Sequence, residues 1–146
     1  MRKNWMDYFM NFAVLASTRS GCHSRQVGCV IVKDNRIIAT GYNAAPFGLM
    51  DCTNTGHCLR KNVKSGTNLN HCFAVHAEQN AITQCAKYGI SCDGATMYVT
   101  THPCVHCMKM IINSGITKVI YMNDYEDELA KSIADKAGLI VQQYML

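Results

Sequence analysis

Segments with the pattern of buried strands alternate with segments of helical periodicity along most of this chain. Strand-like apolar runs occupy five segments, 27–32, 36–42, 95–100, 118–122 and 139–144. Helical spacing of apolar residues recurs in four others, 4–19, 77–88, 104–113 and 126–137. Asp34 and Asn35 favour a turn, and hence an antiparallel hairpin, between the first two strands. The later strands are separated by helices, which favours right-handed crossovers. This order predicts an α/β fold, a three-layer α/β/α sandwich with a mixed five-stranded sheet.

Composition narrows the class of protein further. A length of 146 residues with 49% hydrophobic and 16% charged residues predicts a single globular domain over residues 1–146. No apolar run approaches the ~20 residues of a membrane span, and residues 1–7 are followed by amphipathic sequence instead of a signal-peptide block. We therefore expect a cytoplasmic protein with no membrane partner. The net charge of +4 suits a phosphate-bearing ligand and is too small to indicate nucleic acid.

The chain contains nine cysteines, an unusual number for a protein of this size. In a reducing compartment such cysteines are more often metal ligands, catalytic groups or small buried apolar residues than disulfides. By their positions in the predicted elements, we expect Cys29, Cys85 and Cys92 to be buried apolar residues.

Two short motifs stand at the starts of predicted helices. One is His76-Ala77-Glu78, and the other is Pro103-Cys104-Val105-His106-Cys107. Cys104 and Cys107 are three residues apart, so both thiols lie on one face of a first helical turn. One His and two Cys form a known ligand set for catalytic zinc, with a fourth position left open. The positive end of a helix dipole also favours the thiolate form of cysteine.

Two simpler interpretations exist. Cys104 and Cys107 could be half of a structural zinc site, and His76 could be a histidine of the core. Structural zinc sites usually present two paired motifs, and His-x-Glu is a poor second pair. Because Glu78 is two residues from His76, it faces another direction on the helix and is predicted to stand beside the metal as a proton shuttle.

His-x-Glu followed by Pro-Cys-x-x-Cys is the signature of zinc deaminases that act on nucleobases and nucleotides. Segments 27–43, 76–82, 94–100 and 111–116 extend the likeness. With them the chain resembles the zinc-dependent cytidine and deoxycytidylate (dCMP) deaminase family over roughly residues 15–125. Thr40-Gly41-Tyr42-Asn43 and the long loop after it point to the dCMP branch, away from free cytidine, tRNA and riboflavin-pathway deaminases.

The resemblance implies hydrolysis of dCMP to dUMP and ammonia, which supplies dUMP for thymidylate synthesis. It gives Glu78 the task of protonating cytosine N3 and relaying a proton to the departing amine. It places Asn43 on the sugar hydroxyl, the backbone at Ala77 and near His102 on the cytosine edge, and Tyr125 near the nucleotide. An ordinary turn role for Asn43 and ordinary packing for Tyr125 remain open.

The 5′-phosphate of such a substrate requires cations. Arg25 is the first candidate, ahead of Arg19. Family members often place basic residues where this chain has Ser24 and Gln26, and Arg25 lies between them. A solvated surface arginine is the alternative.

The segment at about 43–72 shows no periodicity, and a loop of this length in a small domain is usually functional or pinned. The resemblance implies a second, structural zinc here, since some microbial and phage members carry one. Cys22 and Cys52 match two of its ligands, His71 is the expected third, and Cys58 or Cys72 the fourth. Ala74 stands where one form of the family has an acidic ligand. A reduced thiol cluster without metal is the alternative.

Residues 41–48 resemble the family's loop for allosteric nucleotides. The resemblance implies activation by dCTP and inhibition by dTTP, with Mg²⁺, in a homo-oligomer, specifically a hexamer. Tyr42, Asn43, Ala45 and Gly48 are the candidate residues. Ala44 replaces a usual glycine, which would be costly if that position needed a positive φ.

Two rival functions remain. One is deamination of another cytosine compound, such as dCTP or deoxycytidine. The other is a zinc-stabilised module that binds nucleic acid. The sequence argues against the second, because it has no basic stripe with interleaved aromatic residues and because Glu78 would put negative charge in the site.

Overall fold

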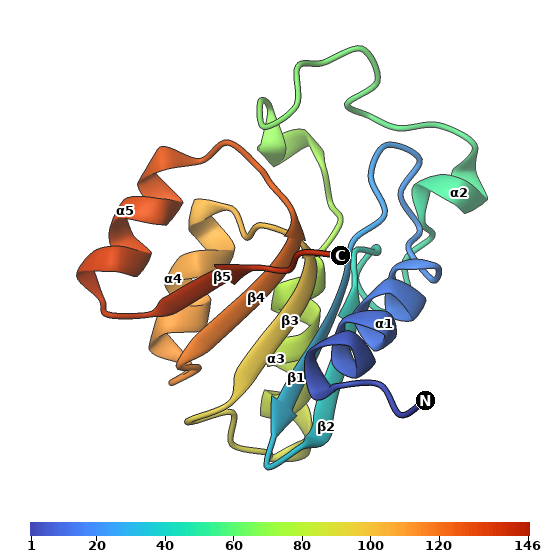
Figure 1. Cartoon of the computed structure of the whole chain (residues 1–146). Helices are drawn as coiled ribbons and strands as arrows, with labels where there is room; N and C mark the ends of the chain where they lie inside the picture. The colour runs from blue at the N-terminus through green and yellow to red at the C-terminus, as the bar shows by residue number, and fades with distance from the viewer.

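The centre of the molecule is a five-stranded sheet with the order β2-β1-β3-β4-β5 (Figure 1). The computed structural model describes residues 1–146, apart from the side chain of Leu69. The strands are β1 (Gly28–Lys33), β2 (Arg36–Tyr42), β3 (Thr96–Thr101), β4 (Lys118–Asn123) and β5 (Ile140–Gln143). Strand β1 pairs antiparallel with β2 and β3, whereas β3, β4 and β5 are parallel to one another. The mixed sheet predicted from the sequence is confirmed.

The β1–β2 hairpin turns at Asp34 and Asn35, with φ of 51° and 56°. Asp and Asn tolerate the left-handed region better than most residues, and two such residues in succession suit the twist of a tight hairpin. The predicted hairpin is therefore formed by the chemistry expected for it.

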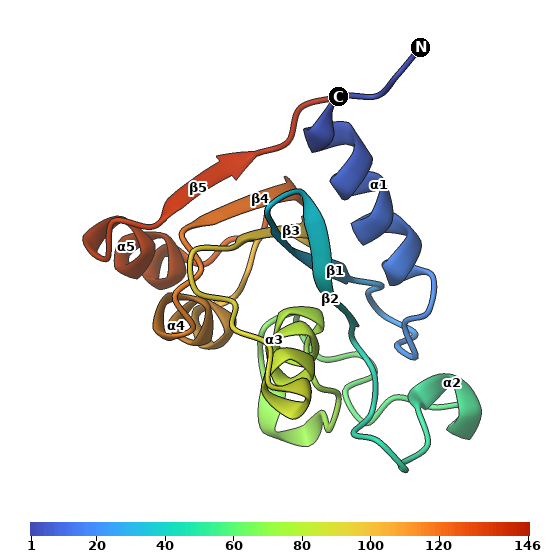
Figure 2. The same ribbon diagram turned by 90° about the horizontal axis from the view of Figure 1, so that it is seen from below.

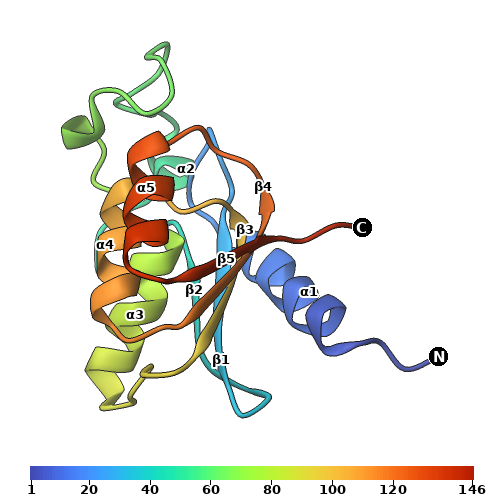
Figure 3. The same ribbon diagram turned by 60° about the vertical axis from the view of Figure 1, so that its left-hand side comes forward.

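Helices cover both faces of the sheet, as Figures 2 and 3 show. They are α1 (Trp5–Ser17), α2 (Cys52–Thr55), α3 (Ala77–Tyr88), α4 (Val105–Asn113) and α5 (Glu128–Lys136), with the 3-10 turn η1 (Leu69–His71). Helix α1 lies alone on one face, and α3, α4 and α5 lie on the other. In the described part of the chain, none of the helices has the length and apolar character needed to span a bilayer.

The helix boundaries follow local capping. The side chain of Asn4 accepts a hydrogen bond from the Asp7 amide and begins α1, as its position predicts. Asp127 caps α5, so this helix starts at Glu128, two residues later than expected. The short helix α2 and turn η1 were not predicted, because neither is long enough to show a period.

Alternate residues of β1 pack against opposite layers. Val30 and Val32 join Phe9, Met10 and Ala13 of α1 on one face. On the other face, the core includes Cys29, Ile31, Ala77, Ala81, Met97, Val99 and Val119. Cys29, Cys85 and Cys92 are buried as predicted, and all nine cysteines are free thiols.

Close contact between β2 and α3 sets the position of the site. Gly41 lies so close to α3 that a Cβ there would overlap the carbonyl oxygen of Ala77. The absence of a side chain at residue 41 therefore allows the start of α3, which carries His76 and Glu78, to rest directly on the end of β2.

Candidate active site

The amino-terminal ends of α3 and α4 bring the two sequence motifs together. His76 is the N-cap of α3 and Cys104 the N-cap of α4, and both have extended backbone conformations. Cys107 lies in the first turn of α4 and is fully buried. The backbone N–H of His76 donates to Oε1 of Gln79 at 2.9 Å, which fixes the entry into α3.

The three predicted metal ligands have the spacing of a tetrahedral site. Nδ1 of His76 lies 3.3 Å from Sγ of Cys107 and 3.6 Å from Sγ of Cys104. Zinc bond lengths to nitrogen and sulfur place tetrahedral ligand atoms about 3.6 Å apart. Among the residues whose side chains are described, this is the one group of three His, Cys, Asp or Glu with ligand atoms all within 4.8 Å. The donor set and its spacing therefore fit zinc.

The two thiols of this cluster ionise differently. Hydrogen bonds from the Cys107 thiol and from His76 lower the pKa of Cys104 to about 4. The pKa of Cys107 is raised, chiefly by its hydrogen bond to Cys104 and by burial. The hydrogen bond to Cys104 in turn raises the pKa of His76. Cys104 thus already carries the negative charge that attracts a cation.

Glu78 lies beside the cluster and outside it. Its side chain is 5% exposed, and Oε2 is 3.6 Å from Sγ of Cys107. Burial raises the pKa of Glu78 from an ordinary 4.5 to about 6. A carboxyl group with a pKa near the working pH both accepts and releases protons readily, so this position suits the predicted proton shuttle.

A pocket opens above the cluster, and every predicted substrate contact lines it. These residues are Arg25, Asn43, Ala77, His102 and Tyr125. The segment 58–74 forms a further wall, and in Figure 1 this segment crosses the end of the molecule as a long arch. Among the described residues, the lining does not include Arg19, the second phosphate candidate.

Asn43 fastens the segment that carries Arg25. Its Oδ1 accepts hydrogen bonds from Ser20 Oγ at 2.6 Å and from the Val27 amide at 2.9 Å. Its Nδ2 donates to the carbonyl of Arg25 at 2.7 Å. One amide hydrogen then remains for a ligand. The loop role and the predicted ligand role of Asn43 are therefore compatible.

Three segments meet at the mouth of the pocket around Tyr125. The Arg25 guanidinium lies 5.1 Å from the centre of the Tyr125 ring, and its Nη2 is 3.5 Å from Ser65 Oγ. Gly66 has a φ of 79°, and a Cβ there would lie 2.8 Å from the Tyr125 hydroxyl oxygen. Tyr125 thus packs against both loops while its side chain lines the pocket.

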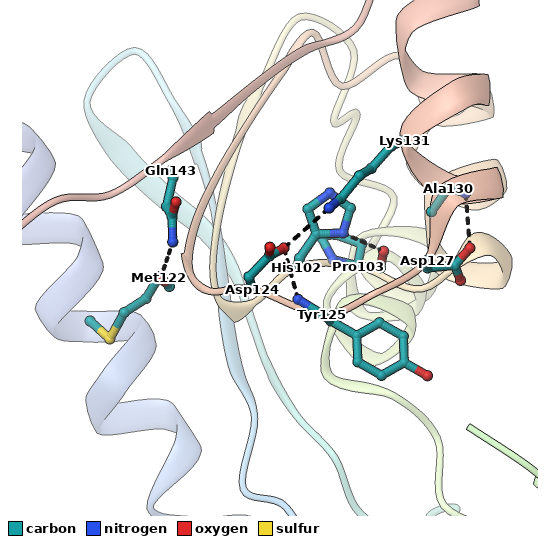
Figure 4. Close-up of polar contacts among 9 residues, drawn as sticks. All are labelled: His102, Pro103, Met122, Asp124, Tyr125, Asp127, Ala130, Lys131 and Gln143. Atoms are coloured by element: carbon teal, nitrogen blue, oxygen red, sulfur yellow. Dashed lines mark hydrogen bonds and ion pairs between the residues drawn. The ribbon is translucent and has the colours of Figure 1, made fainter. Parts of the chain in front are cut away.

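His102 forms part of the pocket floor. It is 3% exposed, its Nδ1 lies 2.9 Å from the carbonyl oxygen of Pro103, and its ring meets Tyr121 edge to face at 4.7 Å. Burial lowers the pKa of His102, which favours the neutral ring. The Nδ1 contact is shown in Figure 4.

Arg60 lines the pocket and was not singled out from the sequence. Its Nε donates to the carbonyl of Thr67 at 3.0 Å, which holds the guanidinium at the wall. Arg60 lies in the long segment without periodicity, so no sequence pattern marked it as pocket-facing.

Four cysteines, Cys22, Cys52, Cys58 and Cys72, line one pocket, although among these described side chains no three sulfurs all lie within 4.8 Å of one another. The pKa of Cys52 is raised by partial burial and by the neighbouring thiols Cys58, Cys22 and Cys72. Backbone amides of Ser24 and Arg60 donate to the sulfurs of Cys22 and Cys58, each at 3.4 Å. His71, the expected third ligand of a second zinc, also lines the pocket but is exposed.

The predicted allosteric residues lie along the chain from the end of β2. Tyr42 and Asn43 are half-buried, Ala45 lines the pocket, and Gly48 has a φ of 89° in an exposed turn. The concern about Ala44 does not apply, because this residue pairs with Val75 in an extended antiparallel bridge. An extended backbone accepts alanine without strain.

A known protein family matches most of this chain, including the residues of the His-Cys-Cys site. The family described as "Cytidine and deoxycytidylate deaminase zinc-binding region" matches residues 3–123. The fold and the His-Cys-Cys site define a zinc-binding deaminase domain, and the chain belongs to the cytidine and deoxycytidylate deaminase family.

Individual relatives cover nearly the whole chain. It is 42% identical over 145 residues to the deoxycytidylate deaminase of Saccharomyces cerevisiae, covering 99% of this chain and 46% of the yeast protein. It is 42% identical to ComE operon protein 2 of Bacillus subtilis, covering 99% of this chain and 74% of that protein. The dCMP deaminase of cyanophage S-TIM5, solved in complex with dCMP and dUMP, superposes with a TM-score of 0.82 at 32% identity and 99% coverage of both chains. The chain spans about half the length of the Saccharomyces cerevisiae protein and of the deoxycytidylate deaminase of Schizosaccharomyces pombe.

Proposed function

We propose that this protein hydrolyses dCMP to dUMP and ammonia. The observation that carries the proposal is the buried Glu78 beside the His76, Cys104 and Cys107 cluster, in a pocket that is also lined by two arginines. The name and bound ligands of the cyanophage relative support deoxycytidylate as the substrate.

His76, Cys104 and Cys107 would hold the zinc. When bound, zinc acts as a Lewis acid that makes water a nucleophile at neutral pH, able to attack C4 of cytosine. Glu78 accepts one proton from the attacking water and delivers it to ring N3. It then moves the second proton to the exocyclic amine, so the C4–N bond breaks, ammonia leaves and the C4 carbonyl remains. The burial of Glu78 keeps bulk water from competing for these protons.

Two arginines in the pocket lining favour a nucleotide over a nucleoside as the substrate. Arg25 and Arg60 both line the pocket, and each guanidinium is held by a contact within the protein. Arginine pairs well with phosphate because its donors match the phosphate oxygens. We therefore assign the 5′-phosphate to these two side chains and the sugar to Asn43.

The test is a comparison of ammonia release from dCMP, dCTP and deoxycytidine. We expect dCMP to have the highest kcat/KM. Arg25→Ala and Arg60→Ala should each lower kcat/KM for dCMP by about 10-fold or more, a value typical of a lost charged hydrogen bond, and leave the rate on deoxycytidine unchanged. Arg36→Ala is the matched control, because Arg36 is exposed at the β1–β2 hairpin. Equal rates on dCMP and deoxycytidine would refute the nucleotide assignment, and salt-dependent RNA binding without deamination would favour the nucleic-acid module.

We also propose a second, structural zinc held by Cys22, Cys52, Cys58 and Cys72. The nearness of the other three thiols, which together with burial raises the pKa of Cys52, and the two N–H···S contacts support a metal site of thiols here. His71 stays the alternative ligand. Metal analysis should give two zinc ions per chain, and Cys58→Ser should reduce this to one, while Cys92→Ala keeps two. One zinc in the unmodified protein would refute the second site.

Regulation is a further part of the proposal. We propose a cytoplasmic homohexamer that supplies dUMP for thymidylate synthesis, with dCTP and Mg²⁺ activating and dTTP inhibiting at Tyr42, Asn43, Ala45 and Gly48. The exposed apolar side chains Phe47, Leu49 and Met50 support burial of this loop between copies. A sigmoidal dCMP curve that dCTP makes hyperbolic is expected. Indifference to both triphosphates, or a monomer in solution, would contradict this part.

A further inference from the structure

The carboxylate of Asp127 joins two helices, one of which carries the metal ligands. Its Oδ1 accepts a hydrogen bond from the Ala130 amide at 3.0 Å and caps α5 (Figure 4). Its Oδ2 accepts from the Val105 amide at 2.8 Å, at the first residue of α4. One half-buried side chain thus satisfies an amide at the start of each helix.

The start of α4 needs such a partner because of Cys104. A helix begins with amides that have no partner within the helix, and the N-cap side chain usually accepts from one of them. The Sγ of Cys104 lies 3.6 Å from Nδ1 of His76 and interacts with the Cys107 amide further along the turn, which leaves the Val105 amide at the first helical position without a partner in its own helix. The first amide of α4 therefore takes its acceptor from another segment of the chain, the carboxylate of Asp127.

Asp127 ends the segment 124–127, which connects β4 to α5 and carries Tyr125 of the pocket. This segment is anchored at both of its ends. The His102 amide donates to the Asn123 carbonyl at 2.8 Å, before the segment. Asp124 accepts from the Tyr125 amide at 2.9 Å and lies 3.6 Å from Nζ of Lys131 (Figure 4). Asp127 closes the segment against α4 and α5, whose shared core is Met108, Ala130 and Ala134. The turn that carries Cys104 and the segment that carries Tyr125 therefore share one anchor.

We propose that Asp127 is a positioning residue that holds the turn carrying Cys104 in the geometry for metal binding. It acts through the Val105 amide and touches neither metal nor substrate. The inference rests on the proposed zinc-dependent function, and it is tested by zinc retention without substrate. Failure of the unmodified protein to hold zinc at His76 would count against the proposed function, whereas unchanged retention in the variant would count against Asp127 alone.

Asp127→Asn separates the two contacts of the carboxylate. Asparagine has one acceptor oxygen in place of two, so only one of the contacts can remain; metal-free stability equal to that of the Asp135→Asn control shows that the α5 cap is the one retained. Its amide group cannot accept from Val105, so the contact with α4 is lost. Asp127→Ala loses both contacts, and Asp135→Asn is the matched control, because Asp135 is exposed on α5 and the change in charge is the same.

The experiment measures zinc transfer from the full-length, zinc-loaded protein to a chromogenic chelator, together with guanidinium unfolding of the metal-free protein. The phase of zinc transfer that is absent from Cys107→Ser is assigned to the site formed by His76, Cys104 and Cys107. We expect Asp127→Asn to bind this zinc about 10–100-fold more weakly, as for other groups that orient metal ligands, with metal-free stability equal to that of Asp135→Asn. Zinc affinity equal to the unmodified protein, or a loss that only parallels a fall in metal-free stability, would overturn the proposal. If Asp127→Ala does not fold, the Asn variant still decides the question.

Discussion

Replacement of Glu78 by glutamine should stabilise the metal-free protein while abolishing most of its activity. Glu78 is 5% exposed, and burial raises its pKa from 4.5 to about 6. Burial therefore disfavours the ionised carboxylate in the folded state. As the pH rises from 4.5 through 6, the unfolded chain releases this proton more readily than the folded chain, and the folded state loses stability.

The size of the effect follows from the two pKa values. The difference between 4.5 and about 6 corresponds to about 2 kcal/mol once both states are ionised, at pH 7.5. At pH 5 the same relation leaves less than about 1 kcal/mol. Glutamine is neutral at both pH values, so Glu78→Gln should be more stable than the unmodified protein by these amounts. For a domain of this size, the melting temperature at pH 7.5 should rise by about 4–8 °C.

Guanidinium unfolding of chelator-treated protein at pH 7.5 and pH 5 measures this difference. Glu126→Gln is the control, because Glu126 is exposed and its replacement should leave stability within about 0.5 kcal/mol. Loss of the proposed proton shuttle should lower kcat on dCMP by at least about 10²–10⁴-fold. No gain in stability at pH 7.5, or a gain that does not shrink at pH 5, would refute the burial argument. Near-normal turnover would refute the catalytic role.

Three further predictions follow from the packing around the site. Gly41→Ala should destabilise the protein by about 3 kcal/mol or more and weaken zinc binding, because a new Cβ would overlap the Ala77 carbonyl and displace the start of α3; unfolding and metal analysis would show it, and unchanged values would contradict the close contact. Met108→Ala should cost about 2–5 kcal/mol, because Met108 is fully buried between α4 and α5; a smaller loss in chemical denaturation would mean that the cavity collapses. Chelation should lower the melting temperature and added zinc should restore it. At free zinc about 1,000-fold above the Kd, binding adds about 4 kcal/mol to the free energy of unfolding. Restoration by Mg²⁺ alone would argue against thiolate ligands.

Local signals in the sequence predicted the elements with little error. The expected segments 36–42 and 77–88 agree with β2 and α3 at both ends. Hairpin residues with positive φ, helix caps and apolar periodicity act over a few residues, so they can be read without knowledge of the fold. The proposed metal ligands could also be predicted from the sequence, because three-residue spacing in a first helical turn determines which side chains share a face.

Contacts between segments far apart in the sequence could not be predicted in this way. The sequence contains no signal that Arg60 faces the pocket, since it lies in a segment without periodicity. Four cysteines spread over residues 22–72 offered several ligand sets, and their grouping around Cys52 depends on how the loops fold over the sheet.

The sequence by itself determined the α/β class, the hairpin and the His76, Glu78, Cys104 and Cys107 constellation, because each depends on spacing along the chain. Only the tertiary structure decided the strand order, the burial that brings the pKa of Glu78 to about 6, and the double contact of Asp127 with α4 and α5. The physical reason is that burial and helix-to-helix hydrogen bonds arise where segments far apart in the chain meet, and no local pattern encodes those meetings.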